Sequence, residues 1–298
     1  MNDEGRKGAY IYCVLAMFGW GSMFVACKFA YEAISGMTLL FFRYLVASSI
    51  LLLIYRKRER PVLSGRDKRN IVLIGVLGYF LSIALQLVGT YYVDASLASI
   101  INTMTPVAMI VFAIWILGER SGVMQLAGIG LTIVGAVIIV AGGDEGSRIA
   151  GIVLSIAGMV LWGLTSVLIR KVCSGLDPVW LTIYAMMVAM AVDIPFAIVE
   201  IYTSGVNMAA LGPAAVMGIL WVGVIPTAVS NLLWSRALEK LPAATCSLFY
   251  AIMPITTGLL GVVLLSESMT VRFAAGSIVV IVGVIVAILG EKKDSLSS

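Results

Sequence analysis

The stretch SIINTMTPVAMIVFAIWILGE, from Ser99 to Glu119, returns 148 residues later as SLFYAIMPITTGLLGVVLLSE, from Ser247 to Glu267. Each copy carries a proline seven residues after its first serine, at Pro106 and Pro254, and ends with an apolar run closed by a glutamate. A repeat at half the length of the chain predicts two halves of related structure.

The amino-acid composition assigns the chain to the membrane. Of its 298 residues, 61% are hydrophobic and 12% are charged, and the mean hydropathy is +1.05, which is too apolar for a soluble domain of this length. Helices are expected rather than a barrel, because a spanning backbone must satisfy its own hydrogen bonds and the short alternating segments of a barrel are absent.

Ten apolar stretches reach the ~20 residues that a helix needs to cross the hydrocarbon core. The expected spans are residues 9–31, 37–55, 70–91, 94–117, 122–142, 149–170, 177–200, 211–235, 242–265 and 271–289. We therefore predict an all-α integral membrane protein with ten transmembrane helices.

The basic residues predict opposite orientations for the two halves. With a cytoplasmic N-terminus, 16 Lys and Arg residues fall on the cytoplasmic side and three fall outside. The loop after the second span holds seven basic residues, whereas its counterpart, Glu200 to Pro213, holds none. We expect two inverted repeats of five helices each, residues 1–143 and 144–298, in the inner (plasma) membrane with both termini in the cytoplasm.

Several short motifs carry a family resemblance. They are Trp20-Gly21 and Trp162-Gly163, Phe42-Arg43-Tyr44, and Leu117-Gly118-Glu119 with its copy Leu265-Ser266-Glu267. With these motifs the chain resembles the ten-helix EamA family of the drug/metabolite transporter (DMT) superfamily over nearly its whole length. The resemblance implies a basket of helices around a central cavity, lined by the first, third, fourth, sixth, eighth and ninth helices. Ser266 occupies the position of the glycine in the first copy, and Ile183 occupies the position that Arg43 has in the first half. The halves are therefore not expected to be functionally equivalent.

Glycines seven residues apart mark the fifth and tenth spans, at Gly128 and Gly135 and again at Gly276 and Gly283. Seven residues make about two helical turns, so each pair lies on one face, where small residues allow a close backbone approach. The pattern predicts that the fifth helix packs against the tenth.

Pro106 and Pro254 lie in the middle of repeat-related spans, where proline removes a backbone hydrogen bond and bends the helix. Two interpretations carry equal weight, a pair of hinges and a pair of fixed kinks. Interrupted helices at matching places in two halves point to a binding site near the midplane of the membrane.

The predicted cavity takes an aromatic and polar lining from these spans. Its candidate substrate-binding residues are Met17, Trp20, Tyr79, Gln86, Asn102, Trp162, Ser166, Asn231, Trp234 and Tyr250. Trp20 and Trp162 are the strongest candidates, because both lie well inside their helices and recur across the repeat. Such a lining favours a small ligand with an apolar part and a few hydrogen-bonding groups, such as an amino acid. A choline-like cation held by cation–π attraction is the alternative.

Charged residues near the membrane need separate interpretations. Arg43 lies ~10 Å inside its helix, close enough to snorkel outward; functionally, it would anchor a substrate carboxylate or act as a gating partner of Asp193. No Asp or Glu lies in the middle of a lining helix, which disfavours a drug–proton antiporter with a central carboxylate. Glu119 and Glu267 end their helices and are interpreted as boundary residues, with proton coupling through them as the minor alternative. Lys28 and Glu32 are interpreted as a solvated outer rim.

Other classes of function fit less well. A membrane enzyme needs clustered histidines, paired carboxylates or a nucleophile with its base, and the apolar spans offer none. A channel needs a continuous polar stripe, whereas the predicted lining is mostly apolar and aromatic. A nucleotide-sugar carrier needs basic residues deep in the cavity to bind phosphate, and only Arg43 and Lys28 could serve. Histidine is absent and the four cysteines show no metal-ligand spacing, so no cofactor and no metal are expected.

We therefore predict a secondary transporter, not an enzyme, that exports an amino acid or a similar metabolite by alternating access. Its expected partners are a small-molecule substrate and the lipid bilayer, with no nucleic acid. A monomer or a weak dimer is the expected functional unit.

Overall fold

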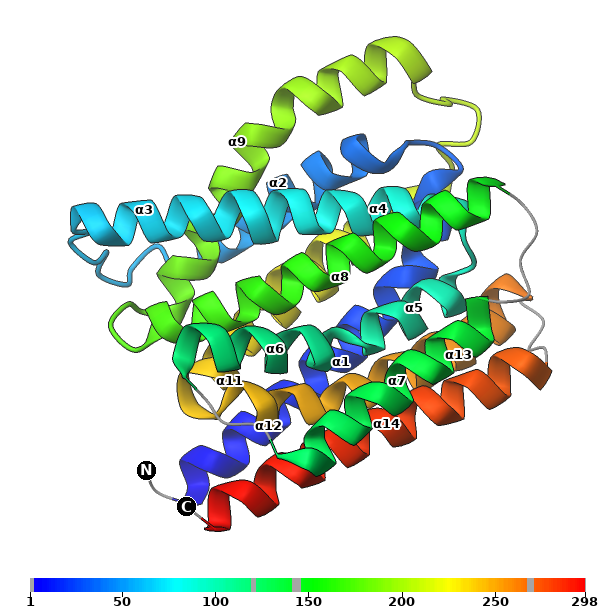
Figure 1. Ribbon diagram of the computed structural model, residues 1–298. Coiled ribbons are helices and arrows are strands. Elements are labelled where there is room, and N and C mark those ends of the chain that lie inside the picture. The colour runs from blue at the N-terminus through cyan, green and yellow to red at the C-terminus, as the bar shows by residue number, and fades with distance from the viewer. Residues whose placement is uncertain (1–2, 119–121, 141–145, 267–270, 298) are drawn as a thin grey trace.

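The computed structural model describes residues 3–118, 122–140, 146–266 and 271–297, and these ranges are helical with no strand (Figure 1). Glu119 and Glu267 lie outside the described residues. The uninterrupted helices are α1 (Asp3–Tyr31), α2 (Gly36–Ile54), α7 (Val123–Val140), α8 (Gly146–Cys173), α9 (Pro178–Ser204) and α14 (Val271–Ser297). The interrupted segments are α3 (Gly65–Ile74), η1 (Gly75–Ser82) and α4 (Ile83–Tyr92); α5 (Ala95–Thr103) and α6 (Thr105–Leu117); α10 (Pro213–Val222), η2 (Gly223–Val229) and α11 (Ser230–Lys240); and α12 (Ala243–Ser247), η3 (Leu248–Ala251) and α13 (Ile252–Leu265).

Within the described residues, seven helical segments are long and apolar enough to cross a membrane. They are Lys7–Tyr31, Gly36–Ile54, Gly65–Tyr92, Leu97–Leu117, Ile149–Cys173, Pro178–Ser204 and Pro213–Lys240. Two shorter apolar helices, Ile252–Leu265 and Ala274–Gly283, accompany them. The prediction of an all-helical membrane protein is confirmed to this extent, and the number of ten spans stays a prediction.

Both copies of the repeated motif are interrupted just before the proline. α5 ends at Thr103, and α6 begins at Thr105 with Pro106 in its first turn. In the second copy, the 3-10 turn η3 leads into α13, which carries Pro254 in its first turn. Proline suits the first helical turn, because an N–H there has no intrahelical acceptor. The prolines therefore follow breaks in the helix rather than bending a continuous one, and their role as hinges stays a prediction.

Two long segments contain a π-helical stretch, η1 and η2, which the sequence pattern does not predict. The stretches begin at Gly75 and Gly223, which are 148 residues apart, the spacing of the repeat. A Cβ on Gly75 would lie 2.8 Å from Val188 Cβ of α9, and a Cβ on Gly223 would lie 2.7 Å from Val46 Cβ of α2. Glycine therefore lets η1 and η2 approach these helices closely. π-helical turns are rare and occur frequently at functional sites.

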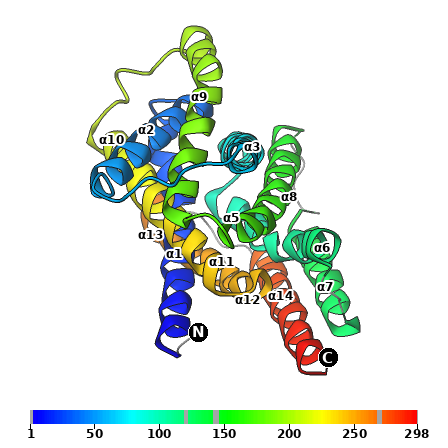
Figure 2. The ribbon, with the colours of Figure 1, turned by 90° about the vertical axis from the view of Figure 1, so that its left-hand side faces the viewer.

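The packing partners of the helices correspond between the halves. α1 packs against α10, α11 and α13, while α8 packs against α4, η1 and α6. α2 packs along α9 at one edge of the molecule, and α7 packs along α14 at the opposite edge (Figures 1 and 2). A Cβ on Gly135 would lie 2.6 Å from the backbone nitrogen of Val280 and 3.0 Å from the carbonyl oxygen of Gly276. The close approach of the fifth and tenth predicted helices is thereby confirmed.

α1 begins and α14 ends at the same end of the bundle (Figures 1 and 2). The loop after α2 meets the start of α9 there: Arg58 forms an ion pair with Asp177, and Trp180 Nε1 donates to the carbonyl oxygen of Glu59 at 2.8 Å. We name this end of the bundle the basic end, because it carries a set of lysine and arginine residues. They are Arg56, Lys57, Arg58, Arg60, Arg170, Lys171, Arg236 and Lys240. Gathering of these cations at one end is what the charge pattern predicts.

Candidate functional site

A small cavity lies where α1, α4, α5, α8, α11 and the η3–α13 segment meet. Its volume is about 20 Å³, and it is lined by Trp20, Met23, Phe24, Ile83, Gln86, Asn102, Trp162, Asn231, Tyr250 and Met253. We name it the central cavity. A space of this size holds about one water molecule, so the helices are closed around it. Both halves of the chain contribute to its lining.

The aromatic rings around the central cavity contact one another. The Trp20 ring lies 5.6 Å from Trp162, 5.4 Å from Trp234 and 6.2 Å from Tyr250, measured between centroids. Trp20 meets Trp162 at an interplanar angle of 87°, and Trp162 meets Tyr79 at 77° with 5.6 Å between centroids. Edge-to-face packing of this kind places the positive ring edge on the negative ring face and stabilises each pair.

Hydrogen bonds fix the three indole rings. Trp20 Nε1 donates to the carbonyl oxygen of Pro226 at 3.0 Å, and Trp162 Nε1 donates to the Tyr250 hydroxyl at 3.0 Å. Trp234 Nε1 donates to Ser166 Oγ at 3.3 Å. Because these N–H groups are satisfied within the protein, the Trp20 and Trp162 rings offer mainly their apolar faces to the central cavity.

The three amides of the lining are held by hydrogen bonds that start from their own NH₂ groups. Gln86 donates to Ser82 Oγ at 3.1 Å, and Asn102 donates to the carbonyl oxygen of Ala98 at 3.1 Å. Asn231 donates to the carbonyl oxygens of Pro226 and Thr227, at 3.1 and 3.0 Å. These two carbonyls belong to η2, where the ordinary helical hydrogen bonds are altered. The amides therefore have fixed orientations at the cavity wall.

The structure brings six of the ten predicted substrate-binding residues to the cavity wall. They are Trp20, Gln86, Asn102, Trp162, Asn231 and Tyr250. Tyr79, Trp234 and Ser166 form a layer behind the wall, through the ring contacts and the hydrogen bond described above. Met17 is fully buried in the core and is not among the lining residues.

Sequence reasoning missed Met23, Ile83 and Met253 as lining residues. Spacing would have found two of them. Ile83 lies three residues before Gln86, which is the same helical face, and Met253 directly precedes the proline of the second motif.

Arg43 does not snorkel, contrary to one of the two interpretations of the sequence. Its side chain is 1% exposed, and its Nε donates to Thr227 Oγ1 at 2.7 Å. The cause lies in η2: Pro226 has no N–H, so the Thr227 hydroxyl donates to the carbonyl oxygen of Val222 at 2.6 Å and its oxygen accepts from Arg43. The hydrogen-bonding needs of an interrupted helix thus hold the guanidinium inside.

The predicted partner of Arg43, Asp193, is fully buried in α9. Among the described residues, neither carboxylate oxygen of Asp193 has a hydrogen-bond partner, and neither does Nη1 of Arg43. The two side chains are therefore not paired in this conformation. Gating by this pair stays a prediction.

Lys28 is not a solvated residue of the rim, contrary to the sequence prediction. Its ammonium donates to the carbonyl oxygens of Thr90, at 2.8 Å, and of Val93, at the end of α4. A cation at a helix C-terminus satisfies carbonyls that lack intrahelical partners. Glu32 is exposed, as expected for the rim.

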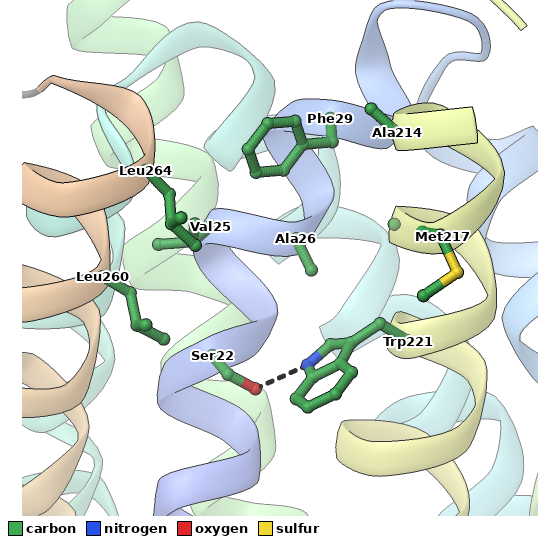
Figure 3. Close-up of a pocket in the computed structure, with 10 residues that line it drawn as sticks. Ser22, Val25, Ala26, Phe29, Ala214, Met217, Trp221, Leu260 and Leu264 are labelled. Carbon is green, nitrogen blue, oxygen red and sulfur yellow. Dashed lines mark hydrogen bonds between the residues drawn. The ribbon is translucent and has the colours of Figure 1, made fainter. Parts of the chain in front are cut away.

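A larger cavity of about 370 Å³ lies between α1, α10 and α13 (Figure 3). Its walls are apolar and include Val25, Phe29 and Leu260. Two lining residues with polar atoms, Ser22 and Trp221, bind each other, because Trp221 Nε1 donates to Ser22 Oγ at 2.9 Å. Figure 3 shows this hydrogen bond between α1 and α10. Ligand sites combine apolar walls with converging polar groups, and the central cavity meets that description better despite its smaller volume.

A polar pocket of about 230 Å³ lies at the basic end. It is lined by Tyr12, Arg58, Asp177, Pro178, Val179, Arg236, Glu239 and Lys240. The Arg58–Asp177 ion pair and the donation from Arg236 to the Tyr55 hydroxyl, at 3.0 Å, join the helices around it. These contacts tie α2, α9 and α11 together at this end.

In the part of the chain that the structure describes, membrane-spanning helices enclose a buried aromatic and polar cavity, an arrangement that suits a membrane transport protein. The model of the EamA-like transporter family matches residues 7–141 and again residues 149–289. The chain therefore belongs to the EamA-like transporter family, and it is a membrane transporter.

Similar proteins are transporters by name. The chain is 24% identical over 279 residues to an uncharacterized transporter of Archaeoglobus fulgidus, across 94% of this chain and 98% of the relative. A second uncharacterized transporter of that organism is 27% identical over 283 residues, across 92% and 95%. The uncharacterized transporter YetK of Bacillus subtilis is 24% identical over 295 residues, across 97% and 89%. One solved crystal structure covers 95% of this chain and 98% of its own with a TM-score of 0.72 at 16% identity, which shows a shared fold.

Proposed function

We propose that the protein is a secondary transporter that exports amino acids or amino-acid-like compounds by alternating access around the central cavity. The observation that carries the proposal is the convergence of indole rings and amides from both halves on one buried space. Indole faces suit an apolar side chain, and amides of fixed orientation suit the ammonium and carboxylate groups of an amino acid. The bound ligand is the small-molecule partner, with no nucleic acid and no cofactor involved.

The proposed architecture has ten spans arranged as two inverted repeats, residues 1–143 and 144–298. The matched positions of η1 and η2 support it, as do the corresponding packing partners of α1 and α8. α7 is 18 residues long and contains no charged residue, which suits a span. The proposed orientation puts the basic end in the cytoplasm and the protein in the inner membrane.

The proposed cycle moves the two halves against each other around the central cavity. The small volume of that cavity and the contacts at the basic end fit a state closed on the cytoplasmic side. Opening requires the Arg58–Asp177 ion pair to separate, and the breaks before Pro106 and Pro254 are the proposed hinges. One chain contains both halves, so a monomer or a weak dimer is the proposed functional unit.

A choline-like cation is the second candidate substrate. The rings of Trp20, Trp162 and Tyr250 favour it, because several aromatic faces around one space suit a cation–π cage. The amides favour the amino acid instead, since a quaternary ammonium has no hydrogen to donate to them.

A ligand screen separates the two substrates. The purified protein would be melted in detergent with amino acids, choline-like amines, nucleosides or cationic drugs, because a ligand that binds the folded state raises the melting temperature. Any hit would then be tested for flux in proteoliposomes. The variants Trp20→Phe and Trp162→Phe replace the indole faces at the cavity wall with smaller rings, and Trp115→Phe, on an exposed side chain, is the matched control.

We expect amino acids to raise the melting temperature of the wild type and of Trp115→Phe, with a smaller rise in the cavity variants. Stabilisation by quaternary amines alone would exclude the amino-acid proposal. Flux that survives alanine at both Trp20 and Trp162 would exclude the central cavity as the binding site.

A further inference from the structure

Two ionisable side chains are buried where α2 packs against α9 and η2. Arg43 is 1% exposed and Asp193 is 0% exposed. Arg43 donates through Nε to Thr227 at 2.7 Å, and its guanidinium carbon lies 5.6 Å from the ring centroid of Tyr44. Within the described part of the chain, Nη1 of Arg43 and both oxygens of Asp193 have no hydrogen-bond partner.

The antiparallel packing of α2 and α9 sets Asp193 level with Tyr44, the neighbour of Arg43. Near the end of α9, Glu200 accepts from the backbone N–H of Met37, at the start of α2. Asp193 lies seven residues before Glu200, and Tyr44 lies seven residues after Met37. Because both helices rise by the same length per residue, Asp193 and the Arg43–Tyr44 pair lie at the same depth.

The charge state of Asp193 follows from this burial. A guanidinium stays charged in proteins, whereas an ionised carboxylate without hydrogen-bond donors is costly inside a membrane protein. A proton on one of the Asp193 oxygens would remove this cost. In the same conformation, Nη1 of the Arg43 guanidinium donates to no atom of the described residues.

The other ionisable groups around Asp193 are few among the described residues. Tyr44 of α2 and Tyr79 of η1 interact with each other, and Tyr44 interacts electrostatically with Asp193. Glu200 is two turns along the same helix. The charged residues of α3 and α11 lie toward the basic end, at the level of Asp177, which is ~24 Å along α9. Among the residues that the structure describes, Arg43 is thus the cation placed at the level of Asp193.

We propose that Asp193 is a proton-binding site whose occupancy is controlled by a change of partner of Arg43. With the proton bound, Arg43 stays on Thr227. When the proton leaves to water, the carboxylate takes the guanidinium from Thr227, and no covalent bond other than O–H changes. This inference rests on the proposed function for its consequence, which is that export is coupled to the entry of protons.

Infrared spectroscopy of the substrate-free protein in liposomes tests the proton site directly. The wild type at neutral pH should show the carbonyl band of a protonated carboxylic acid, and Asp193→Asn should lack it. Glu32→Gln removes an exposed carboxylate and should keep the band unchanged. Thr227→Val releases Arg43 from its present acceptor and should weaken the band, whereas Arg43→Gln should keep it.

A wild-type spectrum without the band, or a band that Asp193→Asn leaves in place, overturns the proton site. An equal band in the wild type and in Thr227→Val overturns the change of partner. Melting curves of each variant establish that it is folded, and the isosteric Thr227→Val keeps the test valid where Arg43→Gln fails to fold.

Flux measurements separate this inference from the proposed function. Proteoliposomes would be loaded with a mixture of the twenty common amino acids and a trapped pH-sensitive dye. Efflux with internal acidification in the wild type, and efflux without acidification in Asp193→Asn, supports coupling. Wild-type efflux without acidification overturns coupling. Absence of efflux overturns the proposed export, and the infrared result then decides the proton site alone.

Discussion

Replacement of Trp20 by alanine tests whether the aromatic cluster holds the two halves together. The side chain is 6% exposed and contacts three rings from the second half of the chain, at centroid distances of 5.4 to 6.2 Å. Truncation of a buried tryptophan costs about 3 to 5 kcal/mol. At ~2 to 4 °C per kcal/mol, we expect the melting temperature to fall by about 10 °C.

Trp20→Phe separates the ring from its hydrogen bond. The variant keeps an aromatic ring but loses donation to the Pro226 carbonyl oxygen. That oxygen still accepts from Asn231, so no buried carbonyl is left without a donor. The expected cost is about 1 kcal/mol, or ~2 to 4 °C in melting temperature.

The assay uses thiols that the protein already carries. A thiol-reactive fluorophore reports unfolding, because the four cysteines are buried in the folded state. They are Cys13, Cys27, Cys173 and Cys246. Trp115→Ala is the control, since that side chain is 78% exposed and its loss should change stability by about 0.5 kcal/mol or less. Equal melting of Trp20→Ala and Trp115→Ala would refute the reasoning.

Three further substitutions probe other parts of the fold. Thr227→Val should cost about 1 to 3 kcal/mol in unfolding free energy, because Arg43 loses an acceptor and a buried carbonyl loses a donor. Glu200→Gln should speed hydrogen exchange at the Thr38 amide about fivefold, since the carboxylate accepts from that N–H at 2.7 Å and caps α2 for about 1 kcal/mol. Gly135→Ala should cost about 1 to 3 kcal/mol by forcing α7 away from α14, measured as a lower melting temperature.

Each of these has its own control. Thr227→Ser keeps the hydroxyl and should restore most of the stability lost in the valine variant. Exchange in the middle of α2 should not respond to Glu200→Gln, and a uniform change along the helix would contradict the capping role. A Cβ on Gly130, in the same helix as Gly135, meets no described atom within 4 Å. Destabilisation by Gly130→Ala equal to that by Gly135→Ala would argue against the close helix contact.

Local pattern was enough to predict most helices and the core of the candidate site. The expected span 37–55 is α2 to within a residue, and 94–117 matches the α5–α6 segment, because the length of an apolar stretch is set by the bilayer rather than by tertiary contacts. The repeat then indicated which residues share a depth. Trp20 and Trp162 meet because equivalent helices of the two halves face one interior.

Features that depend on distant partners could not be predicted. The burial of Arg43 depends on Thr227, 184 residues later in the chain. At the π-helical stretches, α9 and α2 closely approach Gly75 and Gly223, and no local periodicity of the sequence predicts that approach. Lys28 lies near the end of its helix, which suggested a solvated rim residue. Its ammonium instead binds carbonyl oxygens at the end of α4.

The start of α1 and the end of α14 lie at one end of the bundle, which permits a covalent test of the functional unit. Because α1 begins where α14 ends, a short flexible linker can join two copies in tandem without crossing the bilayer (Figure 2). A tandem with one copy disabled would retain half of the flux if each copy works alone. It would lose nearly all of it if the copies must act as a pair.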